Sequence, residues 1–346
     1  MKIHPNHLKK IVLVLLVVFS TASTKAQDIH FSQFYASPLT LNPALTGIND
    51  CNYRASINYR NQWHSITVPT TFTTFAAAFD INSLAARNIK TGNLSAGLVI
   101  FSDKAGDGDL SNTSVLASAG YRYSFDEAKK YSLSVGLQTG YVHKGFNIEL
   151  LDFEDEFNGT NFTGIATNEN FPKTGLGYLD MNAGLLFVGN VSPKINVYAG
   201  AAAFHLIQPK ESFLNNANSK LNMRTVAHAG AKVKFNEKWS IVPSVLYMGQ
   251  SKATEINFGT NLGYHISNAN MESDIYFGGY YRLGDAVNLM VGGEFNSVRL
   301  GLSYDINISG LSSATNNKGG FELSLSYTGC IGGLILEPPV LWCPRF

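Results

Sequence analysis

Residues 254–307 read TEINFGTNLGYHISNANMESDIYFGGYYRLGDAVNLMVGGEFNSVRLGLSYDIN, and this stretch decides the fold. In its first segment the apolar Ile256 and Phe258 alternate with the polar Glu255 and Asn257. The alternation continues in the segments that follow, where the apolar positions are Ile275, Phe277, Tyr281, Leu283, Val287, Leu289, Val291, Phe295, Val298, Leu300, Leu302, Tyr304 and Ile306. A period of two predicts β-strands that have one apolar and one polar face.

The length of these segments indicates a membrane. Each runs for roughly 10 to 12 residues, against about 5 to 6 for an ordinary strand. A tilted strand of about 9 to 11 residues crosses a bilayer. Strands in lipid must close into a barrel, because an open edge would leave backbone hydrogen-bonding groups without partners. We therefore predict an all-β fold, an antiparallel transmembrane β-barrel.

The same alternation, bounded by turn residues, predicts about 14 strands from Cys51 onward. The predicted spans are 51–63, 70–82, 91–102, 112–125, 131–146, 175–189, 194–208, 222–236, 238–250, 254–267, 272–283, 286–296, 298–309 and 319–328. We divide the chain into a signal peptide (1–27), an N-terminal lead-in (28–50), the barrel (51–328) and a C-terminal tail (329–346).

The lengths of the connections agree with this division. Outer-membrane barrels have short periplasmic turns and longer outer loops. If the lead-in is periplasmic, the connections on the inside are 126–130, 190–193, 237, 268–271 and 297, all of them short. Those on the outside are 103–111, 147–174, 209–221 and 310–318.

Composition fits a lipid-facing barrel. The 26 Lys and Arg residues nearly balance the 25 Asp and Glu residues, so charge gives no indication of nucleic acid as a partner. Charged residues make up only 15% of the chain, aromatic residues reach 12%, and there are 32 Gly. Such a chain suits strands with a lipid face and aromatic girdles, and the lipid bilayer is its expected surroundings.

Residues 1–27 are typical of a secretory signal. A basic start ending at Lys10 precedes an apolar stretch from Ile11 to Phe19, and Ala26–Gln27 is a plausible cleavage point. No other segment approaches about 18 apolar residues, so we expect no inner-membrane helix. A cleaved signal together with barrel strands predicts a multi-pass protein of a bacterial outer membrane.

The chain has three cysteines, Cys51, Cys330 and Cys343. In an oxidising periplasm Cys330 and Cys343 could pair and leave Cys51 free, although spacing alone does not establish this bridge. The cysteine spacing matches no metal site, and we expect neither a metal nor a cofactor.

Charged side chains on the polar faces predict a charged lumen. The residues predicted to face inward are Arg54, Arg60, Arg122, His143, Arg224, His228, Lys232, Glu255, His265, Asp274, Arg282, Glu294, Arg299 and Asp305. Their mixed signs favour salt-bridged plugging over an ion filter of one sign. The acidic loops around Asp103–Asp109 and Asp152–Glu156 are interpreted as solvated surface. His30, His64 and His205 are isolated, no nucleophile–base pair stands out, and we do not expect an enzyme.

The lead-in does not alternate. Pro38, Pro43 and Gly47 punctuate it, which predicts an irregular or short-helical segment that lies in the lumen or at the periplasmic mouth. Its motif residues are Phe31, Ser32, Gln33, Phe34 and Tyr35, then Ser37 and Pro38, then Leu41, Asn42, Pro43 and Ala44, then Thr46 and Gly47. The pattern continues through Arg54, Tyr59, Arg60, Asn61, Gln62 and Trp63, and the chain ends Cys-Pro-Arg-Phe.

This pattern resembles the opening of the PorP/SprF family of the Bacteroidetes type IX secretion system. The resemblance implies an outer-membrane barrel that serves export or surface attachment of large adhesins, in some members for gliding motility. It implies two kinds of partner: secreted cargo that carries a C-terminal secretion domain, and other secretion components on the periplasmic side.

Two hypotheses follow. In the first, the protein anchors a secreted partner through its long outer loops, and the lead-in plugs the lumen. Phe31, Phe34, Tyr35 and Trp63 then either pack within the barrel or contact the partner. In the second, the barrel is a passive transporter for small solutes. The lumen discriminates between them, because a conducting pore needs a continuous wet path.

Overall fold

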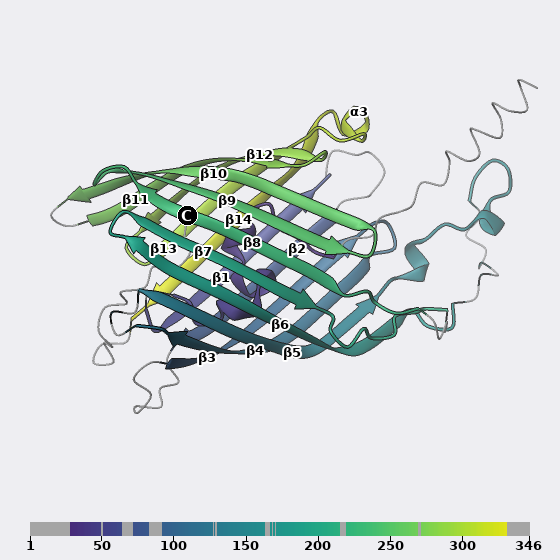
Figure 1. Ribbon diagram of the computed structural model, residues 1–346. Coiled ribbons are helices and arrows are strands. Elements are labelled where there is room, and N and C mark those ends of the chain that lie inside the picture. The colour runs from purple at the N-terminus through teal and green to yellow at the C-terminus, as the bar shows by residue number, and fades with distance from the viewer. Residues whose placement is uncertain are drawn as a thin grey trace, which may run out of the picture.

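The computed structural model describes residues 28–49, 51–63, 72–82, 92–126, 128, 130–162, 167, 169, 171–214, 219–268 and 271–330. In this part of the chain 14 strands form a closed antiparallel barrel (Figure 1). Every strand pairs with its neighbours in sequence, and the first pairs with the last to close the ring.

The strands are β1 (Tyr53–Gln62), β2 (Phe72–Asn82), β3 (Gly92–Ala105), β4 (Leu110–Ser124), β5 (Tyr131–Gly145), β6 (Gly175–Ser192), β7 (Ile195–Phe204), β8 (Arg224–Lys234), β9 (Trp239–Gln250), β10 (Ala253–Asn268), β11 (Met271–Arg282), β12 (Ala286–Phe295), β13 (Val298–Asn307) and β14 (Lys318–Gly329). Each predicted span corresponds to one of these strands, so the predicted fold class is confirmed. No helix within the described residues is long and apolar enough to cross a membrane.

The period of two sorts the side chains as predicted. On β10, Phe258 and Leu262 are 46% and 39% exposed on the outer face, whereas Asn257 and Asn261 are 1% and 0% exposed on the inner face. Lipid covers an apolar outer face without cost, and a closed ladder satisfies the backbone at membrane depth. His143 is a wrong assignment, because the even-numbered residues of β5 face inward and this side chain is exposed on the outer face.

The two ends of the barrel differ. The long-connection end carries the connections that follow odd-numbered strands, including 146–174, 205–223 and 308–317. The short-turn end carries connections such as 193–194 and 296–297, and β1 begins and β14 ends there.

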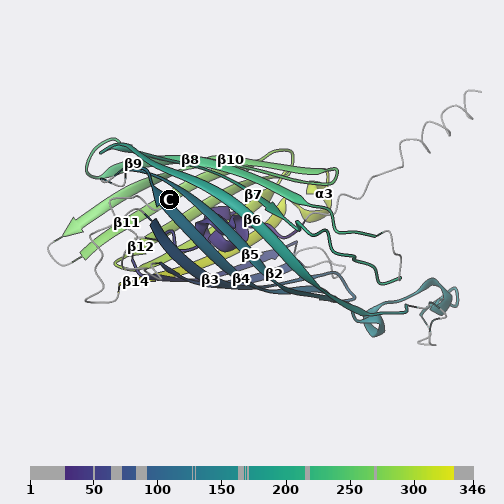
Figure 2. The ribbon, with the colours of Figure 1, turned by 60° about the horizontal axis from the view of Figure 1, so that its bottom comes forward.

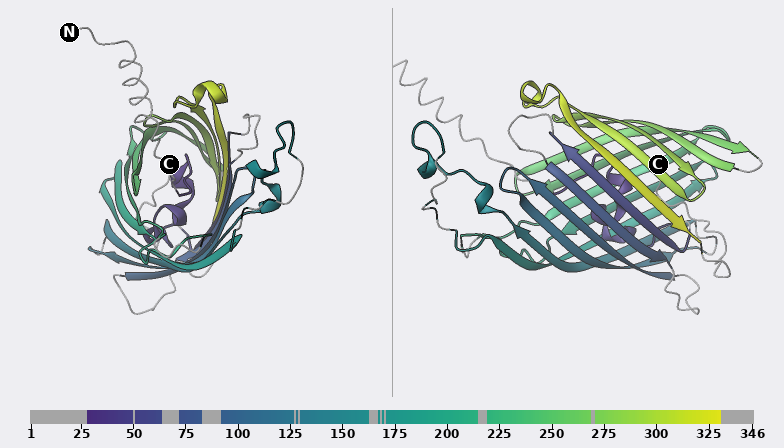
Figure 3. Two further views of the ribbon diagram at one scale, coloured as in Figure 1. Left: turned by 90° about the vertical axis from the view of Figure 1, so that its right-hand side faces the viewer. Right: turned by 180° about the vertical axis from the view of Figure 1, so that it is seen from behind.

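The lead-in (residues 28–49) lies inside the ring of strands, as the view along the barrel shows (Figure 3). It forms three short helices, η1 (Phe34–Ala36), α2 (Pro38–Leu41) and η2 (Pro43–Leu45). The remaining short helices, η3 (Ile148–Leu150), η4 (Glu154–Glu156) and α3 (Ser312–Thr315), lie in connections at the long-connection end. The lead-in was predicted to lie either in the lumen or at the periplasmic mouth, and in the structure it lies in the lumen.

Apolar side chains of the lead-in form a core with the inner barrel wall. The lead-in contributes Phe34, Leu41, Ala44, Leu45 and Ile48. The wall contributes Leu186, Val188, Tyr198, Ala202, Phe204, Val226, Leu246 and Tyr280. A second cluster joins Leu39, which is fully buried, to Val99 and Leu116. The lumen therefore holds a packed interior of the kind that a soluble domain has.

Glycines make room for the lead-in on two neighbouring strands. A Cβ atom at Gly136 of β5 would overlap the backbone of Pro43, and one at Gly184 of β6 would overlap the side chain of Asn42. Backbone and side chain can approach this closely only where the wall carries no side chain of its own.

The structure corrects the predicted disulfide. Cys330 is bonded to Cys51, with their Cα atoms 4.8 Å apart, so the predicted Cys330–Cys343 bridge is wrong. Ring closure explains the difference, because Tyr53 pairs with Gly329 and the residues flanking this pair meet across the β1–β14 seam. Cys343 lies outside the described residues.

We predict that peptide mapping without reduction recovers one cross-linked pair containing Cys51 and Cys330. A Cys51→Ser variant should lose this pair and leave Cys330 open to alkylation. A Cys330–Cys343 pair in the unreduced wild-type protein would contradict the assignment.

Candidate functional site in the lumen and at its mouth

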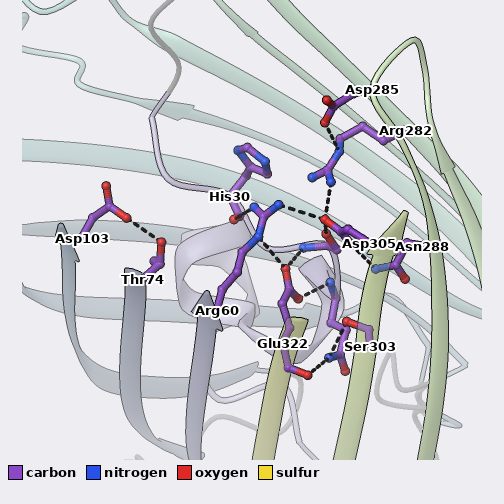
Figure 4. Close-up of polar contacts among 12 residues, drawn as sticks. His30, Arg60, Thr74, Asp103, Arg282, Asp285, Asn288, Ser303, Asp305 and Glu322 are labelled. Carbon is purple, nitrogen blue, oxygen red and sulfur yellow. Dashed lines mark hydrogen bonds and ion pairs between the residues drawn. The ribbon is translucent and has the colours of Figure 1, made fainter. Parts of the chain in front are cut away.

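A network of buried charges lies on the inner wall where β11 to β14 adjoin β1, near the long-connection end, and its polar contacts are drawn in Figure 4. Arg60 of β1 lies 3.0 Å from Asp305 of β13 and 3.2 Å from Glu322 of β14, and all three side chains are 3% exposed. Arg282 of β11 pairs with the same Asp305. Two arginines and two carboxylates from four strands thus form one network, in which β1 from the start of the barrel meets β11, β13 and β14 from its end.

This network binds the backbone of the lead-in. The Glu322 carboxylate accepts hydrogen bonds from the backbone N–H groups of Ser32 and Gln33, the latter at 2.9 Å. The Ser32 hydroxyl donates to Asp305 at 2.8 Å, and the Gln33 amide donates to the Ser303 hydroxyl at 3.0 Å. Buried N–H groups without partners would cost free energy, and charged acceptors make the strongest hydrogen bonds to them.

Asn42 connects the lead-in to the middle of the wall. Its side-chain amide donates to the Leu185 carbonyl at 3.0 Å and lies 3.0 Å from Nε2 of His228. Its Oδ1 accepts from the Ala44 backbone N–H at 2.9 Å and so caps η2. One side chain therefore both shapes the lead-in and holds it against β6 and β8.

A third set of contacts holds the carboxyl-terminal end of the lead-in, near the short-turn end of the barrel. Asp80 of β2 accepts from the Gly47 backbone N–H at 2.7 Å and from the Arg54 side chain at 2.9 Å. Arg54 also donates to the carbonyls of Leu45 and Ile48. Gly47 has φ +68°, a conformation that favours glycine, as its place in a predicted turn required.

An ion cluster surrounds the amino-terminal end of the lead-in, at the mouth of the barrel on the long-connection end. His205 lies directly after β7, 2.8 Å from Asp28 and 2.9 Å from Asp180, and Arg224 lies 3.6 Å from Asp28. Burial lowers the pKa of His205, but its hydrogen bonds to Asp180 and Asp28 outweigh this and raise it to about 9. Burial raises the pKa of Asp28, but Arg224 and His205 hold it well below its ordinary value.

The predicted motif residues divide into two groups. Those from 31 to 47 and Arg60 form the lead-in and its anchors, as described above. Phe34 and Tyr35 also pack their rings against Tyr280 of β11, at centroid distances of 6.0 Å and 5.9 Å. Gln62 ends β1, and Trp63 packs on Phe72 at 5.1 Å at the long-connection end.

Sequence reasoning missed several partners. Asp80, Asp180 and Glu322 were not among the residues predicted to face inward, although the alternation around Glu322 in FELSLSY places it on the inner face. His205 was interpreted as isolated. Its two carboxylate partners are 25 and 177 residues away in sequence. Pairing of β6 with β7 brings Asp180 to it, and the position of the lead-in inside the lumen brings Asp28.

The connections at the long-connection end form a structured platform, which we define as the described residues of 146–174 and 205–223. Phe146 packs on Phe171 and Phe213 at centroid distances of 5.3 Å and 5.0 Å. Lys144 of β5 pairs with Glu211. Aromatic packing and an ion pair thus join two connections into one unit that extends beyond the barrel (Figure 2).

The tip of the platform exposes apolar rings. Phe157 and Phe162 form a β-bridge, their ring centroids are 5.2 Å apart, and they are 47% and 48% exposed. The acidic residues of connection 146–174 are Glu149, Asp152, Glu154, Asp155, Glu156 and Glu169. Paired aromatic rings exposed on an aqueous loop are typical of a binding surface.

Two cavities beside the lead-in are small. Both are lined in part by Thr40 and Arg224, and each has a volume of about 20 Å³, which is space for about one water molecule. Within the described ranges no cluster of three or more His, Cys, Asp or Glu side chains is arranged to hold a metal ion. The lumen holds a segment of the protein's own chain, and the platform beyond it is an exposed surface.

The sequence matches a family model described as type IX secretion system membrane protein PorP/SprF, over residues 23–327. No curated protein matches the chain.

Solved barrels are similar in form. The toluene transporter TbuX of Ralstonia pickettii has 13% identity and a TM-score of 0.49, over 84% of this chain and 92% of that one. The toluene transporter TodX of Pseudomonas putida has 12% identity and a TM-score of 0.47, over 84% and 92%. The KdgM porin has 10% identity and a TM-score of 0.33, over 79% and 99%. At these identities and TM-scores, the similarity extends no further than the barrel form already described.

We predict that Glu322→Gln loosens the amino-terminal half of the lead-in. Hydrogen bonds to charged groups contribute about 1.5 to 3 kcal/mol each, so amide exchange at Ser32 and Gln33 should rise roughly 10- to 100-fold. Glu294→Gln is the matched control, because Glu294 pairs with Arg299 on the wall itself. Equal exchange in wild type and Glu322→Gln would show that this carboxylate does not hold the lead-in.

We also predict that the mouth cluster weakens at alkaline pH. The pKa of His205 is raised in the fold from 6.5 to about 9. Its ion pair with Asp28 therefore contributes fully below about pH 6.5, and the contribution is lost as pH rises through about 9. An NMR titration of labelled histidine, with His205→Asn to identify the resonance, should give a midpoint near 9. A midpoint at or below about 7 would rule the pairing out.

Proposed function

Since the chain belongs to the PorP/SprF family of type IX secretion system membrane proteins, we propose that it is an accessory barrel of the outer membrane. In this role it supports export and cell-surface attachment of secreted proteins, adhesins among them, by binding their C-terminal domains. A role in gliding motility follows where the attached protein is a motility adhesin. The alternative, a passive transporter for small solutes, requires an open lumen.

The filled lumen is the observation that carries this proposal. Leu39 and Asn42 of the lead-in are both 0% exposed, and polar contacts hold the lead-in at three levels between Ser32 and Gly47. A folded protein cannot pass through a barrel filled in this way, and the two cavities described beside the lead-in each have space for about one water molecule. The barrel therefore acts through its surfaces.

The platform supports binding on the outer face. Barrels of this kind direct long connections outward and short turns to the periplasm, so we place the platform on the cell surface. Exposed Phe157 and Phe162 resemble the aromatic anchors that carry most of the energy of protein interfaces. The short-turn end then faces the periplasm, where the other secretion components bind.

The test is a pull-down of the tagged full-length protein from detergent-solubilised outer membranes, with mass spectrometry of the proteins that co-purify. We expect a large secreted protein with a C-terminal secretion domain, or periplasmic secretion components, in near-equal amounts. A barrel that purifies alone from cells that secrete such proteins would contradict the proposal.

We predict that Phe157→Ser combined with Phe162→Ser weakens capture of the secreted partner. Loss of an aromatic anchor costs about 2 kcal/mol, which corresponds to a roughly thirtyfold higher Kd. Phe125→Ser is the matched control, because Phe125 is 56% exposed but follows β4 at the short-turn end. Equal affinity in all three proteins would place the binding surface elsewhere.

A further inference from the structure

The contacts of the lead-in follow the barrel axis in one direction. Ser32 and Gln33 contact β13 and β14 near the long-connection end, and Asn42 contacts β6 and β8 in the middle. Thr46 and Gly47 contact Ser95 and Asp80, near the short-turn end of β3 and β2. The lead-in therefore begins near the long-connection end of the lumen and ends near the short-turn end, where it continues into β1.

The first described residue of the lead-in lies at the mouth that bears the platform. The Asp28 backbone N–H donates to Gln250, the last residue of β9, at 3.1 Å. Its carboxylate contacts His205, which follows the last residue of β7, and Arg224, which is the first of β8. All three wall residues mark the long-connection end.

One residue connects this mouth to the platform. His205 begins the connection 205–223, and its backbone has φ +59°, an uncommon conformation for a residue with a side chain. Its ring bonds Asp28 through Nε2 and Asp180 through Nδ1. The same connection carries Phe213 and Glu211, which pack in the platform. The connection that contacts the end of the lead-in through His205 is thus itself part of the platform.

We infer that the lead-in enters the barrel through the mouth that bears the platform, and that its amino-terminal end forms part of the surface that a secreted partner contacts. The identity of the partner rests on the proposed function. The position of the lead-in end and the platform at the same end of the barrel does not. A partner seated on connection 205–223 then lies next to Asp28, so binding outside is linked through His205 to the segment that fills the lumen.

The direction of threading orders the steps of assembly. The predicted signal is basic and then apolar, and it precedes Asp28 directly. While it remains in the inner membrane, Asp28 cannot reach the opposite mouth of an outer-membrane barrel. The inferred direction of threading therefore requires that the predicted signal is removed before the lead-in enters the barrel.

The test compares the accessibility of one short epitope at three positions of the full-length protein in its own membrane. One variant carries it between Gln27 and Asp28, and a second carries it after Gly159 in the platform, where the structure leaves open space. A third carries it in the turn 193–194 at the short-turn end. Antibody is added to intact cells and to permeabilised cells.

We expect the epitopes at Asp28 and Gly159 to be labelled together in intact cells, and the epitope at 193–194 only after permeabilisation. Labelling of the Asp28 and Gly159 epitopes together only after permeabilisation would keep the threading direction and overturn the outward orientation in the proposed function. Labelling of the Gly159 epitope in intact cells, with the Asp28 epitope accessible only after permeabilisation, would overturn the inference.

Discussion

The position of the lead-in depends on Arg60 and the two carboxylates on either side of it. All three side chains are buried in the lumen. Glu322 accepts from the backbone of Ser32 and Gln33, Asp305 accepts from the Ser32 hydroxyl, and Arg60 donates to the His30 carbonyl. A buried ion pair contributes little net stability, because desolvation offsets its attraction, but removing one partner leaves a buried charge. Such a network therefore favours one register of the lead-in over shifted ones.

Apolar burial and the ionic network have separate roles. Leu39, Leu41, Leu45 and Ile48 remove apolar surface from water, which favours a filled lumen in any register. Charged and polar contacts at three levels then select one arrangement. Together they fill the lumen with the protein's own amino-terminal segment. This is why we assign the function to the platform and the short-turn face and not to the lumen.

The sequence predicted the barrel well because period two is a local property. The alternation around Glu255 and Asn257 tells which face a residue occupies, and it placed nearly every inward charge correctly. It does not tell which residues meet, because that depends on ring closure. The disulfide was therefore assigned to Cys343, a neighbour in sequence, when Cys51 lies across the seam. The prediction for His143 was wrong for a simpler reason. His143 is an odd-numbered residue of β5, and the even-numbered residues of this strand face inward.

The candidate site was predictable only in part. Pro38, Pro43 and Gly47 indicated an irregular lead-in, but nothing in its local pattern distinguished the lumen from the periplasmic mouth. The partners of Asp28 and His205 come from strands and connections far away in sequence. The platform was predicted as long outer loops, but not as a packed unit, because the contact of Phe146 with Phe213 depends on neighbouring strands.

The most direct test of the account is single-channel recording of the purified full-length protein in planar lipid bilayers, with a known porin as the positive control. A barrel closed by its own lead-in should give no conductance steps above the bare membrane. Regular ion-conducting steps from the unmodified protein would mean that the lumen is open, and would contradict the assignment of function to the surfaces.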